Sequence, residues 1–331
     1  MFRLKRILFI IVPAGILLLV FVYDVVRRTV EFDGGGMMYF RETGIAVAFF
    51  SIFLFLDGQR AKRGSVAPKE MGKLLITALG AVAVIGVVQM VPSGSFTELD
   101  ASYVPGNSVT VFFSLILAVA VGVVAIISLL TIKDLVFHKR KKGTRRNFLI
   151  YVVTLLGASF LLFPFLAEEI SVFSTGPFIG ATVMIVVNSF RQNWIVYLSR
   201  REKIYCIIYS ALLSLTFLAL SLLLTNRTFL NKALVFFSNP LEQFVLLNMI
   251  FGATYFGMAF VTTLFHLPTA EVYERKQSEL NSLHNLSRLV TRVFDFRDLV
   301  STVTHLTREV CGARSAWLEL VKREGSATVP V

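Results

Sequence analysis

The polar residues Asn188, Arg191 and Gln192 lie together inside a stretch that is otherwise largely apolar, residues 176–198. Their spacing of three and four positions places all three on one face of a helix. Ionisable residues are costly inside a bilayer and usually mark a functional site. An arginine near a helix end can instead extend its long side chain to the aqueous interface. The cluster is therefore either an interface anchor or a site that responds to a stimulus.

Other residues that carry chemistry are sparse and isolated. The two cysteines, Cys206 and Cys311, lie far apart in the sequence, and neither belongs to a spacing typical of a disulfide framework or a metal site. No stretch matches a catalytic motif. We therefore expect no catalytic residue, no metal and no cofactor within these 331 residues.

The composition around these residues is that of an integral membrane protein. Hydrophobic residues make up 55% of the chain and charged residues 16%, compared with about a quarter in soluble domains. The net charge of +12 would fit nucleic-acid binding, but its densest part, residues 138–146, lies between two apolar runs. Basic residues in that position set membrane topology and attract anionic lipid headgroups. We therefore expect a lipid bilayer, and no nucleic acid, as the partner.

Eight segments are apolar and long enough to cross a bilayer core, which needs roughly 20 residues per helix. They lie near 7–26, 43–57, 73–92, 108–132, 147–167, 176–198, 204–225 and 241–266. The first is too long for a secretion signal and lacks a small-residue cleavage site. The second crosses only if it is extended back to Tyr39. These segments predict an all-α polytopic membrane domain over residues 1–268.

The distribution of basic residues orients these spans. If the N-terminus is cytoplasmic, every cytoplasmic loop contains several Lys or Arg residues, whereas the opposite loops contain few or none. This agreement with the positive-inside rule predicts that both ends of the chain are cytoplasmic. The longest loop with apolar character on the opposite side, 225–240, is either an interfacial helix or a plain loop with buried aromatic residues.

The composition of the chain changes from apolar to charged at Pro268. This proline marks either the membrane exit or a kink in a continuous helix. Residues 269–296 have the pattern of a charged signalling helix, with a coiled-coil seam in its second half. The seam consists of Leu283, Leu286, Val290 and Val293. Because it spans only about two heptads, an ordinary amphipathic helix is the alternative. Paired copies of this helix would make the protein a homodimer.

Residues 297–331 predict a second amphipathic helix, followed by a strand. Gly312 has the residue type preferred just beyond a helix end. The run Ser315–Val321 predicts a β-strand, and residues 322–325 predict the turn after it. One strand with its helices buries too little surface for an independent domain, so we expect this part to be disordered or loosely docked.

The stretch "LSRLVTRVFDFRDLVSTVTHLTREVCGARSAWLELV" resembles the opening of a bacterial GAF domain. That family shows a leucine-rich helix, a break of the type "lDldeLl", a helix ending in Gly-Ala and then a strand. The corresponding residues here are Leu286–Val290, Phe294–Leu299, Cys311–Ala313 and Ser315–Val321. The resemblance implies the first helix and strand of an incomplete α/β domain. Its ligand pocket would be built from later residues, so the chain is expected to stop just inside the domain.

A multipass membrane block followed by a signalling helix and a GAF start resembles the front part of bacterial membrane sensors. Such proteins continue into an output domain, here most similar to the SpoIIE-type serine/threonine phosphatase group, with histidine kinases next. The resemblance implies location in the bacterial inner membrane, cytoplasmic signalling proteins as partners, and any enzymatic activity outside these residues. His284 lies on a helix as a kinase phosphoacceptor would, but Asn285 follows it where the kinase pattern has an acidic residue.

Two other classes of protein remain as alternatives. A transporter or channel with a regulatory cytoplasmic tail would place charges within the spans, whereas Asp24, Asp57 and Glu168 are expected at span ends. A membrane enzyme acting on lipids would need clustered ionisable residues at one membrane face, and Arg191 with Asn188 is the only candidate. The C-terminal segment, rather than the membrane part, therefore favours the sensor.

Overall fold

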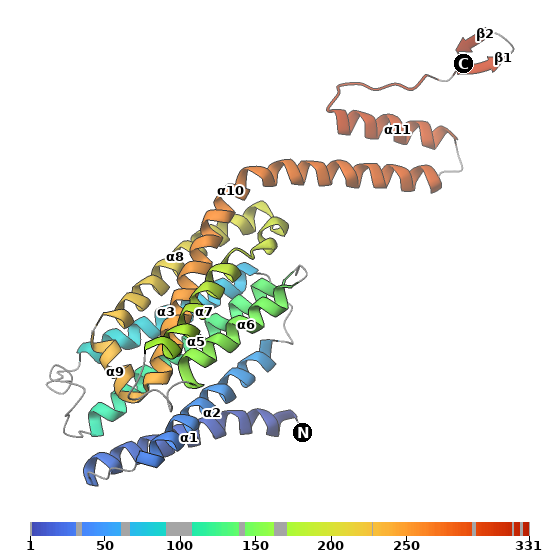
Figure 1. The fold of residues 1–331 in the computed structure, drawn as a ribbon. Coiled ribbons are helices and arrows are strands. Elements are labelled where there is room, and N and C mark those ends of the chain that lie inside the picture. The colour runs from blue at the N-terminus through green and yellow to red at the C-terminus, as the bar shows by residue number, and fades with distance from the viewer. Residues whose placement is uncertain are drawn as a thin grey trace. The chain divides into compact units, whose positions relative to one another are not determined.

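The computed structural model describes residues 2–30, 35–60, 67–90, 108–138, 143–161, 171–226, 228–292, 296–319, 321–324 and 327–330. The chain divides into two compact units, Met1–Phe265 and His266–Val331, here called the bundle and the C-terminal unit. The helices that begin in the bundle are α1 (Phe2–Val30), α2 (Gly35–Arg60), α3 (Ala67–Met90), α5 (Ser108–Phe137), α6 (Thr144–Leu156), the π-helix η1 (Gly157–Leu161), α7 (Ser171–Ser189), the 3-10 helix η3 (Asn193–Tyr197), α8 (Arg200–Thr225), α9 (Phe229–Phe237) and α10 (Asn239–Arg292) (Figure 1).

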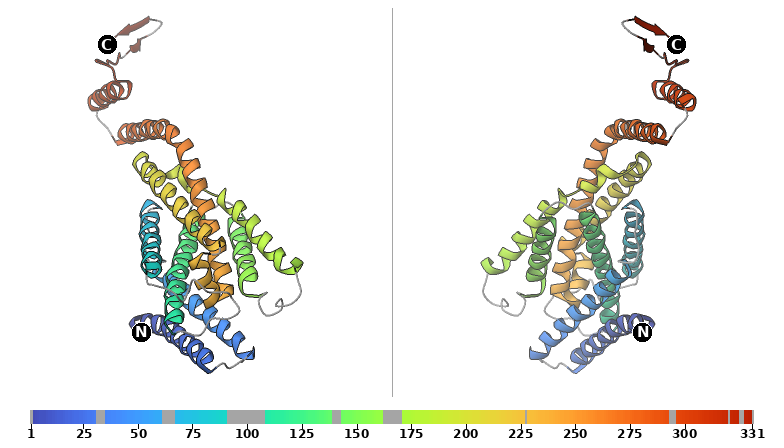
Figure 2. Two further views of the ribbon diagram at one scale, coloured as in Figure 1. Left: turned by 90° about the vertical axis from the view of Figure 1, so that its left-hand side faces the viewer. Right: turned by 90° about the vertical axis from the view of Figure 1, so that its right-hand side faces the viewer.

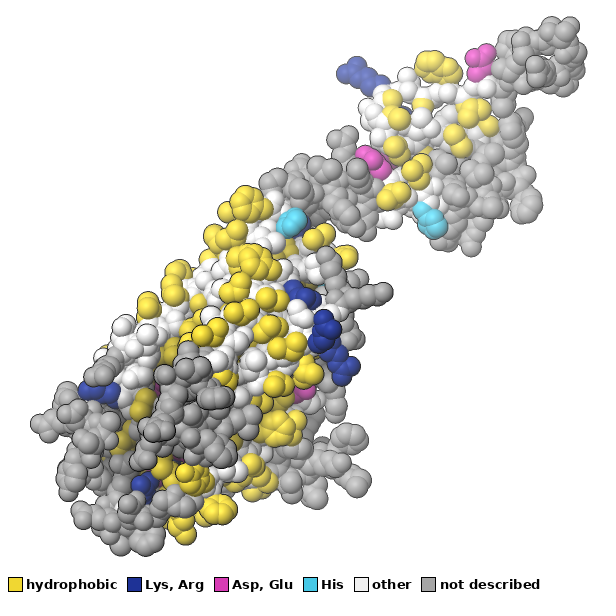
Figure 3. Space-filling view, in the orientation of Figure 1, with side chains coloured by type: hydrophobic (Ala, Val, Ile, Leu, Met, Phe, Trp, Pro, Cys, Tyr) yellow, Lys and Arg dark blue, Asp and Glu magenta, His cyan; other side chains and the backbone are white. Residues whose placement is uncertain are grey.

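Large apolar side chains cover the outside of the bundle. Phe40 is 80% exposed, Ile76 72% and Leu19 70%, and hydrophobic side chains are spread over the visible face of the bundle (Figure 3). Soluble monomers rarely expose so much contiguous apolar surface. Among the described residues, five helices are long and apolar enough to cross a membrane. They are Met37–Arg60, Ala67–Met90, Val109–Phe137, Arg200–Thr225 and Asn239–His266.

Five of the eight expected spans correspond to these helices. The other three, 7–26, 147–167 and 176–198, fall on α1, on α6 with η1, and on α7. The end of the fifth expected span lies outside the described residues, and α7 ends at Ser189, well before the predicted end of the sixth. The described helices therefore support an all-α bundle with five helices long and apolar enough to cross a membrane, but not a count of eight.

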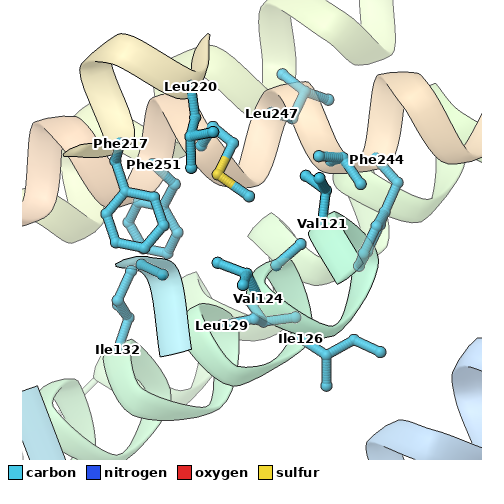
Figure 4. Packing of buried hydrophobic residues seen from close by; sticks show 14 of the residues in the cluster. Val121, Val124, Ile126, Leu129, Ile132, Phe217, Leu220, Phe244, Leu247 and Phe251 are labelled. Atoms are coloured by element: carbon cyan, nitrogen blue, oxygen red, sulfur yellow. The ribbon is translucent and has the colours of Figure 1, made fainter. Parts of the chain in front are cut away.

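Helix α5 forms the centre of the bundle. Of its most apolar window, 67% is buried inside the protein, against 22% for α2. Figure 2 shows α3 on one side of α5 and the α6–α7 pair on the other. Side chains of α5, α8 and α10 point into a shared interior, among them Val121, Val124, Phe217 and Phe251 (Figure 4). Because α5 is apolar on every face, only a position surrounded by other helices or lipid suits it.

Two glycines allow helices of the bundle to approach closely. A Cβ atom added to Gly122 in α5 would lie 2.3 Å from Phe49 Cε1 in α2. A Cβ atom added to Gly252 in α10 would lie 2.9 Å from the ring of Phe217 in α8. Small residues at such contacts let backbones pack tightly without a hydrophobic driving force between helices. In both contacts, an aromatic ring occupies the space that the missing side chain leaves.

Residues 225–240 were predicted to form either an interfacial helix or a plain loop. They contain helix α9. The side chains of Leu230, Ala233, Leu234 and Phe237 follow helical spacing and are all buried. This face of α9 packs on the bundle, where α5 and α8 are its neighbours. The segment is therefore an amphipathic helix whose apolar face is covered by protein.

Helix α10 continues from the bundle into the C-terminal unit without interruption, from Asn239 to Arg292. Pro268 lies within it, so the helix does not end at this proline. The predicted signalling-helix seam falls partly inside α10. Leu283 is 61% exposed, the side chains of Leu286 and Val290 are outside the described part of the structure, and Val293 lies outside the described residues.

The helix α11 (Phe296–Cys311) of the C-terminal unit ends as its sequence predicts. Gly312 adopts a left-handed conformation with φ of 60°. The backbone N–H of Ala313 donates to Arg308 O at 3.1 Å, and that of Gly312 donates to Glu309 O at 3.4 Å. These two bonds satisfy carbonyl groups of the last turn in the Schellman arrangement.

The strand predicted at Ser315–Val321 is wrong in its position. Residues 315–319 have no regular structure, and the strand β1 covers Val321–Glu324, where the sequence predicted a turn. It pairs antiparallel with β2 (Ala327–Pro330), Glu324 lying opposite Ala327. The pairing decides the register, because a strand needs a partner for its backbone groups. Gly325–Ser326 between the strands is a hairpin signal that could have been recognised.

Candidate functional site

A buried ionic network joins α1, α2 and the start of α10. Arg41 in α2 makes a two-pronged contact with Asp24 in α1: its Nε donates to Oδ1 at 2.6 Å and its Nη2 to Oδ2 at 2.8 Å. Its Nη1 also donates to the neighbouring Glu42. The three side chains are only 6–9% exposed. Two-pronged arginine–carboxylate pairs fix geometry as well as charge, so the network holds α1 and α2 in one relative position.

The network is bonded directly to the last residue of α9 and to the residue that precedes α10. Arg41 Nη2 donates to the carbonyl of Phe237, and the guanidinium lies 5.6 Å from the centre of the Phe237 ring. Ser238 Oγ donates to Glu42 Oε2 at 2.5 Å and accepts from the backbone N–H of Leu241 at 3.2 Å. Ser238 therefore serves as the N-cap of α10. One hydroxyl group links the carboxylate of α2 to the first turn of the longest helix.

A further buried carboxylate lies in the first turn of α10. Glu242 is 6% exposed. Asn231 Nδ2 in α9 donates to Glu242 Oε1 at 3.3 Å and to the carbonyl of Leu224 at 2.6 Å. Helix α9 thus supplies an amide N–H donor to the first turn of α10.

Sequence reasoning missed this site because the pattern places Asp24 at a span end and the second span near 43–57. Nothing in that pattern brings Arg41 and Glu42 to Asp24. Helix α2 begins at Gly35, so Arg41 and Glu42 lie well inside it. Three ionisable residues near the first turn between spans were a usable signal, because charges at that depth are uncommon without a partner.

The structure does not bring Asn188, Arg191 and Gln192 onto one helical face. Helix α7 ends at Ser189, where Asn188 Nδ2 and Ser189 Oγ donate to the carbonyls of Met184 and Ile185. Side chains that bond to the preceding turn in this way compete with continuation of the helix. Only Asn188 of the predicted cluster lies within α7.

The other two residues of the cluster bond to different helices. Arg191 Nη1 donates to Thr144 Oγ1 at the start of α6, at 2.9 Å. Gln192 is buried, and its Nε2 donates to the carbonyl of Tyr255 in α10 at 2.9 Å. Arg191 thus anchors the end of α7 beside the basic segment 138–146, whereas Gln192 contacts the helix that leaves the bundle.

Tyr255 is the second point at which polar side chains hold α10. Trp194 in η3 donates through Nε1 to Tyr255 Oη at 2.9 Å, and both side chains are buried. Ser214 in α8 donates to the carbonyl of Ala253 at 3.1 Å. Three bonds from η3, the residue before it and α8 thus converge on one turn of α10.

Replacing Tyr255 by Phe is expected to destabilise the bundle by about 1–3 kcal/mol, because the buried indole N–H of Trp194 loses its acceptor. The measurement uses a Trp317→Phe chain, since Trp317 is 83% exposed and Trp194 1%. The single remaining tryptophan should then become more accessible to acrylamide on mild heating. The matched control, Tyr205→Phe at an exposed position, should change neither accessibility nor stability.

Ion pairs also join the C-terminal ends of α2 and α5, at the other end of α2 from Arg41. Lys133 pairs with Asp57, and Arg60 lies 3.5 Å from Asp134 Oδ2 and donates to Thr131 Oγ1 at 3.0 Å. The four charged residues line a cavity of about 910 Å³, together with residues of α3, η3 and the first turn of α8. The cavity wall carries both signs of charge, so it selects neither anions nor cations by net charge alone.

No protein-family model, curated protein or solved structure matched the chain. The class is therefore defined by the fold and the contacts alone. The chain is an all-α protein with helices that are long and apolar enough to span a membrane. The last of these helices, α10, has polar contacts at its start and at Tyr255, and it extends beyond the bundle.

Proposed function

We propose that this chain is the membrane-embedded module of a signal-transducing sensor in the bacterial inner membrane. Eight spans, with both ends cytoplasmic, detect a membrane or periplasmic stimulus. The helix that follows relays it to a GAF-like domain and an output domain, a SpoIIE-type phosphatase in preference to a histidine kinase. The resemblance of residues 286–321 and the positive-inside pattern support this arrangement.

The observation that carries the proposal is the continuity of α10. Its first turn is tied to the ionic network through Ser238, and its middle is bonded to η3 through Tyr255. The same helix then runs on to Arg292. A rearrangement among α1, α2 and α9 therefore acts directly on the element that leads to the C-terminal unit.

The free energies of the buried contacts are similar in size to the free energy needed to shift a helix between two arrangements. A ligand that moves a two-state equilibrium from 1:99 to 99:1 must favour one state by about 5.5 kcal/mol. Breaking a buried charge pair costs about 3–5 kcal/mol. A stimulus that competes with one or two bonds of the ionic network can therefore shift α10 between two arrangements.

The proposal predicts a dimer contact along the cytoplasmic part of α10. A Leu283→Cys chain, with the exposed Cys311 replaced by Ser, should form an intermolecular disulfide in membrane vesicles under mild oxidation. An Asn285→Cys chain should do so much more slowly, because residue 285 lies on nearly the opposite side of the helix from residue 283. The readout is the rate of dimer formation on a denaturing gel.

The relay itself is tested by adding Ser238→Ala to the Leu283→Cys chain. This change removes the bonds from Ser238 to Glu42 and Leu241, and the crosslinking rate at residue 283 should change several-fold. The matched control is Ser210→Ala, since the buried Ser210 bonds only within α8 to Ile207 O. Equal rates in both variants, with both chains folded, would show that the start of α10 does not act on its cytoplasmic part.

A further inference from the structure

An apolar groove lies on the membrane-facing side of the bundle, between α2 and α6. Its volume is about 480 Å³, and its wall is formed by α2, α5, α6 and the start of α10. The side chains that line it include Ala46, Phe50, Phe53, Leu129, Val152 and Leu156. In a bilayer such a groove is in contact with lipid chains rather than with water, because the side chains along most of its wall are apolar.

Lys133 gives the groove a polar end. Among the described residues that line it, Lys133 is the only charged one, and its side chain is only 21% exposed. Thr43 also lines the groove, but its hydroxyl donates to the carbonyl of Tyr39 at 2.7 Å. Lys133 also lines the polar cavity at the ends of α2 and α5. Lys133 therefore lies where the apolar groove meets the polar cavity.

The length of the groove matches one leaflet. Along α2 it extends from Thr43 to Phe53, which corresponds to roughly 15 Å at the helical rise of 1.5 Å per residue. The hydrocarbon core of a bilayer is about 30 Å thick, so one leaflet contributes about half of that. An acyl chain that begins at the level of Lys133 would fill the groove as far as Thr43.

Helix α6 begins with basic residues, just before its groove-lining positions. Arg145 and Arg146 are exposed in the first turn of α6, the helix that contributes Val152 and Leu156 to the groove. Helix α6 also begins here, so the positive end of its dipole points the same way. A negatively charged headgroup at this end meets Lys133 and two arginines, whereas the groove itself accepts only hydrocarbon.

We propose that this groove is a binding site for an anionic phospholipid of the leaflet at the basic end of the bundle. One acyl chain lies between α2 and α6, and the phosphate lies beside Lys133 in competition with Asp57. The lipid would bridge α2, which carries the ionic network, to α6, which is bonded to Arg191. The site depends on membrane embedding and does not depend on the sensor function.

The test uses the full chain in phosphatidylcholine vesicles that contain phosphatidylglycerol with a photoreactive acyl chain. Crosslinks should concentrate on Phe50, Phe53, Val152 and Leu156. Ala46→Phe fills the groove and should abolish these crosslinks. Ala83→Phe, at an exposed position of α3, is the matched control and should leave them unchanged.

The headgroup contact is tested by two variants of the ion pair. Lys133→Met should weaken the preference for phosphatidylglycerol over a photoreactive phosphatidylcholine by about five-fold, the effect of one basic side chain at a membrane surface. Asp57→Asn also breaks the ion pair but keeps Lys133, and the preference should persist. If crosslinks are no denser in the groove than on α3, or if Ala46→Phe leaves them unchanged, the site does not exist. If Lys133→Met keeps the full preference, the assignment of the headgroup is wrong.

Discussion

Replacing Arg41 by Met is expected to destabilise the bundle by about 3–5 kcal/mol, the largest effect of any single substitution considered for this chain. Arg41 is the cation that faces both Asp24 and Glu42, and all three side chains are buried. Without it, two carboxylates remain in a poorly solvated position close to each other. The measurement is the midpoint of thermal unfolding of the purified chain in detergent, which should fall sharply.

A double-mutant cycle separates the stabilisation by the Asp24–Arg41 ion pair from the effect of removing either side chain alone. Asp24→Asn together with Arg41→Met leaves one buried carboxylate fewer, so the double variant should be more stable than the sum of the single effects predicts. Arg201→Met removes an exposed charge at the start of α8 and should change the midpoint very little. Equal effects of Arg41→Met and Arg201→Met would mean that the ionic network contributes nothing to stability.

The second large effect is expected from Gly122→Ala. The added methyl group would lie 2.3 Å from Phe49 Cε1 and 2.9 Å from Phe49 Cζ, so the ring or the helix has to move. Phe49 is itself buried against the bundle, and overpacking of this kind costs about 1–3 kcal/mol. The same thermal measurement in detergent should record a lower midpoint for the variant.

The ring and the glycine should compensate for each other. Phe49→Leu shortens the side chain that occupies the space beside Gly122, so Gly122→Ala combined with Phe49→Leu should recover most of the stability lost in the glycine variant. The matched control is Gly86→Ala in α3, where nothing lies within 4 Å of the added atom. That change should be neutral or slightly stabilising, because alanine favours the helix. A Gly86 variant as unstable as the Gly122 variant would point to a general cost rather than to the α2–α5 contact.

Some elements were predictable because their information is local. The end of α11 at Gly312 follows from the preference of one residue type for a left-handed conformation. The apolar helices follow from composition and length, since only helices satisfy every backbone group within one segment of a bilayer. The strand at residue 315 was misplaced because a strand is stabilised by its partner, and the partner at Ala327–Pro330 was not recognised.

The sequence by itself determined that this protein is helical, that it belongs in a membrane, and that its character changes near Pro268. These properties depend on hydropathy, charge and residue type, which are summed along the chain. Only the tertiary structure decided that Arg41 meets Asp24 and the carbonyl of Phe237, that Gln192 and Trp194 reach Tyr255, and that Lys133 lies at the end of an apolar groove. Such contacts join residues that are distant in sequence, and their partners depend on how the helices pack rather than on any local pattern.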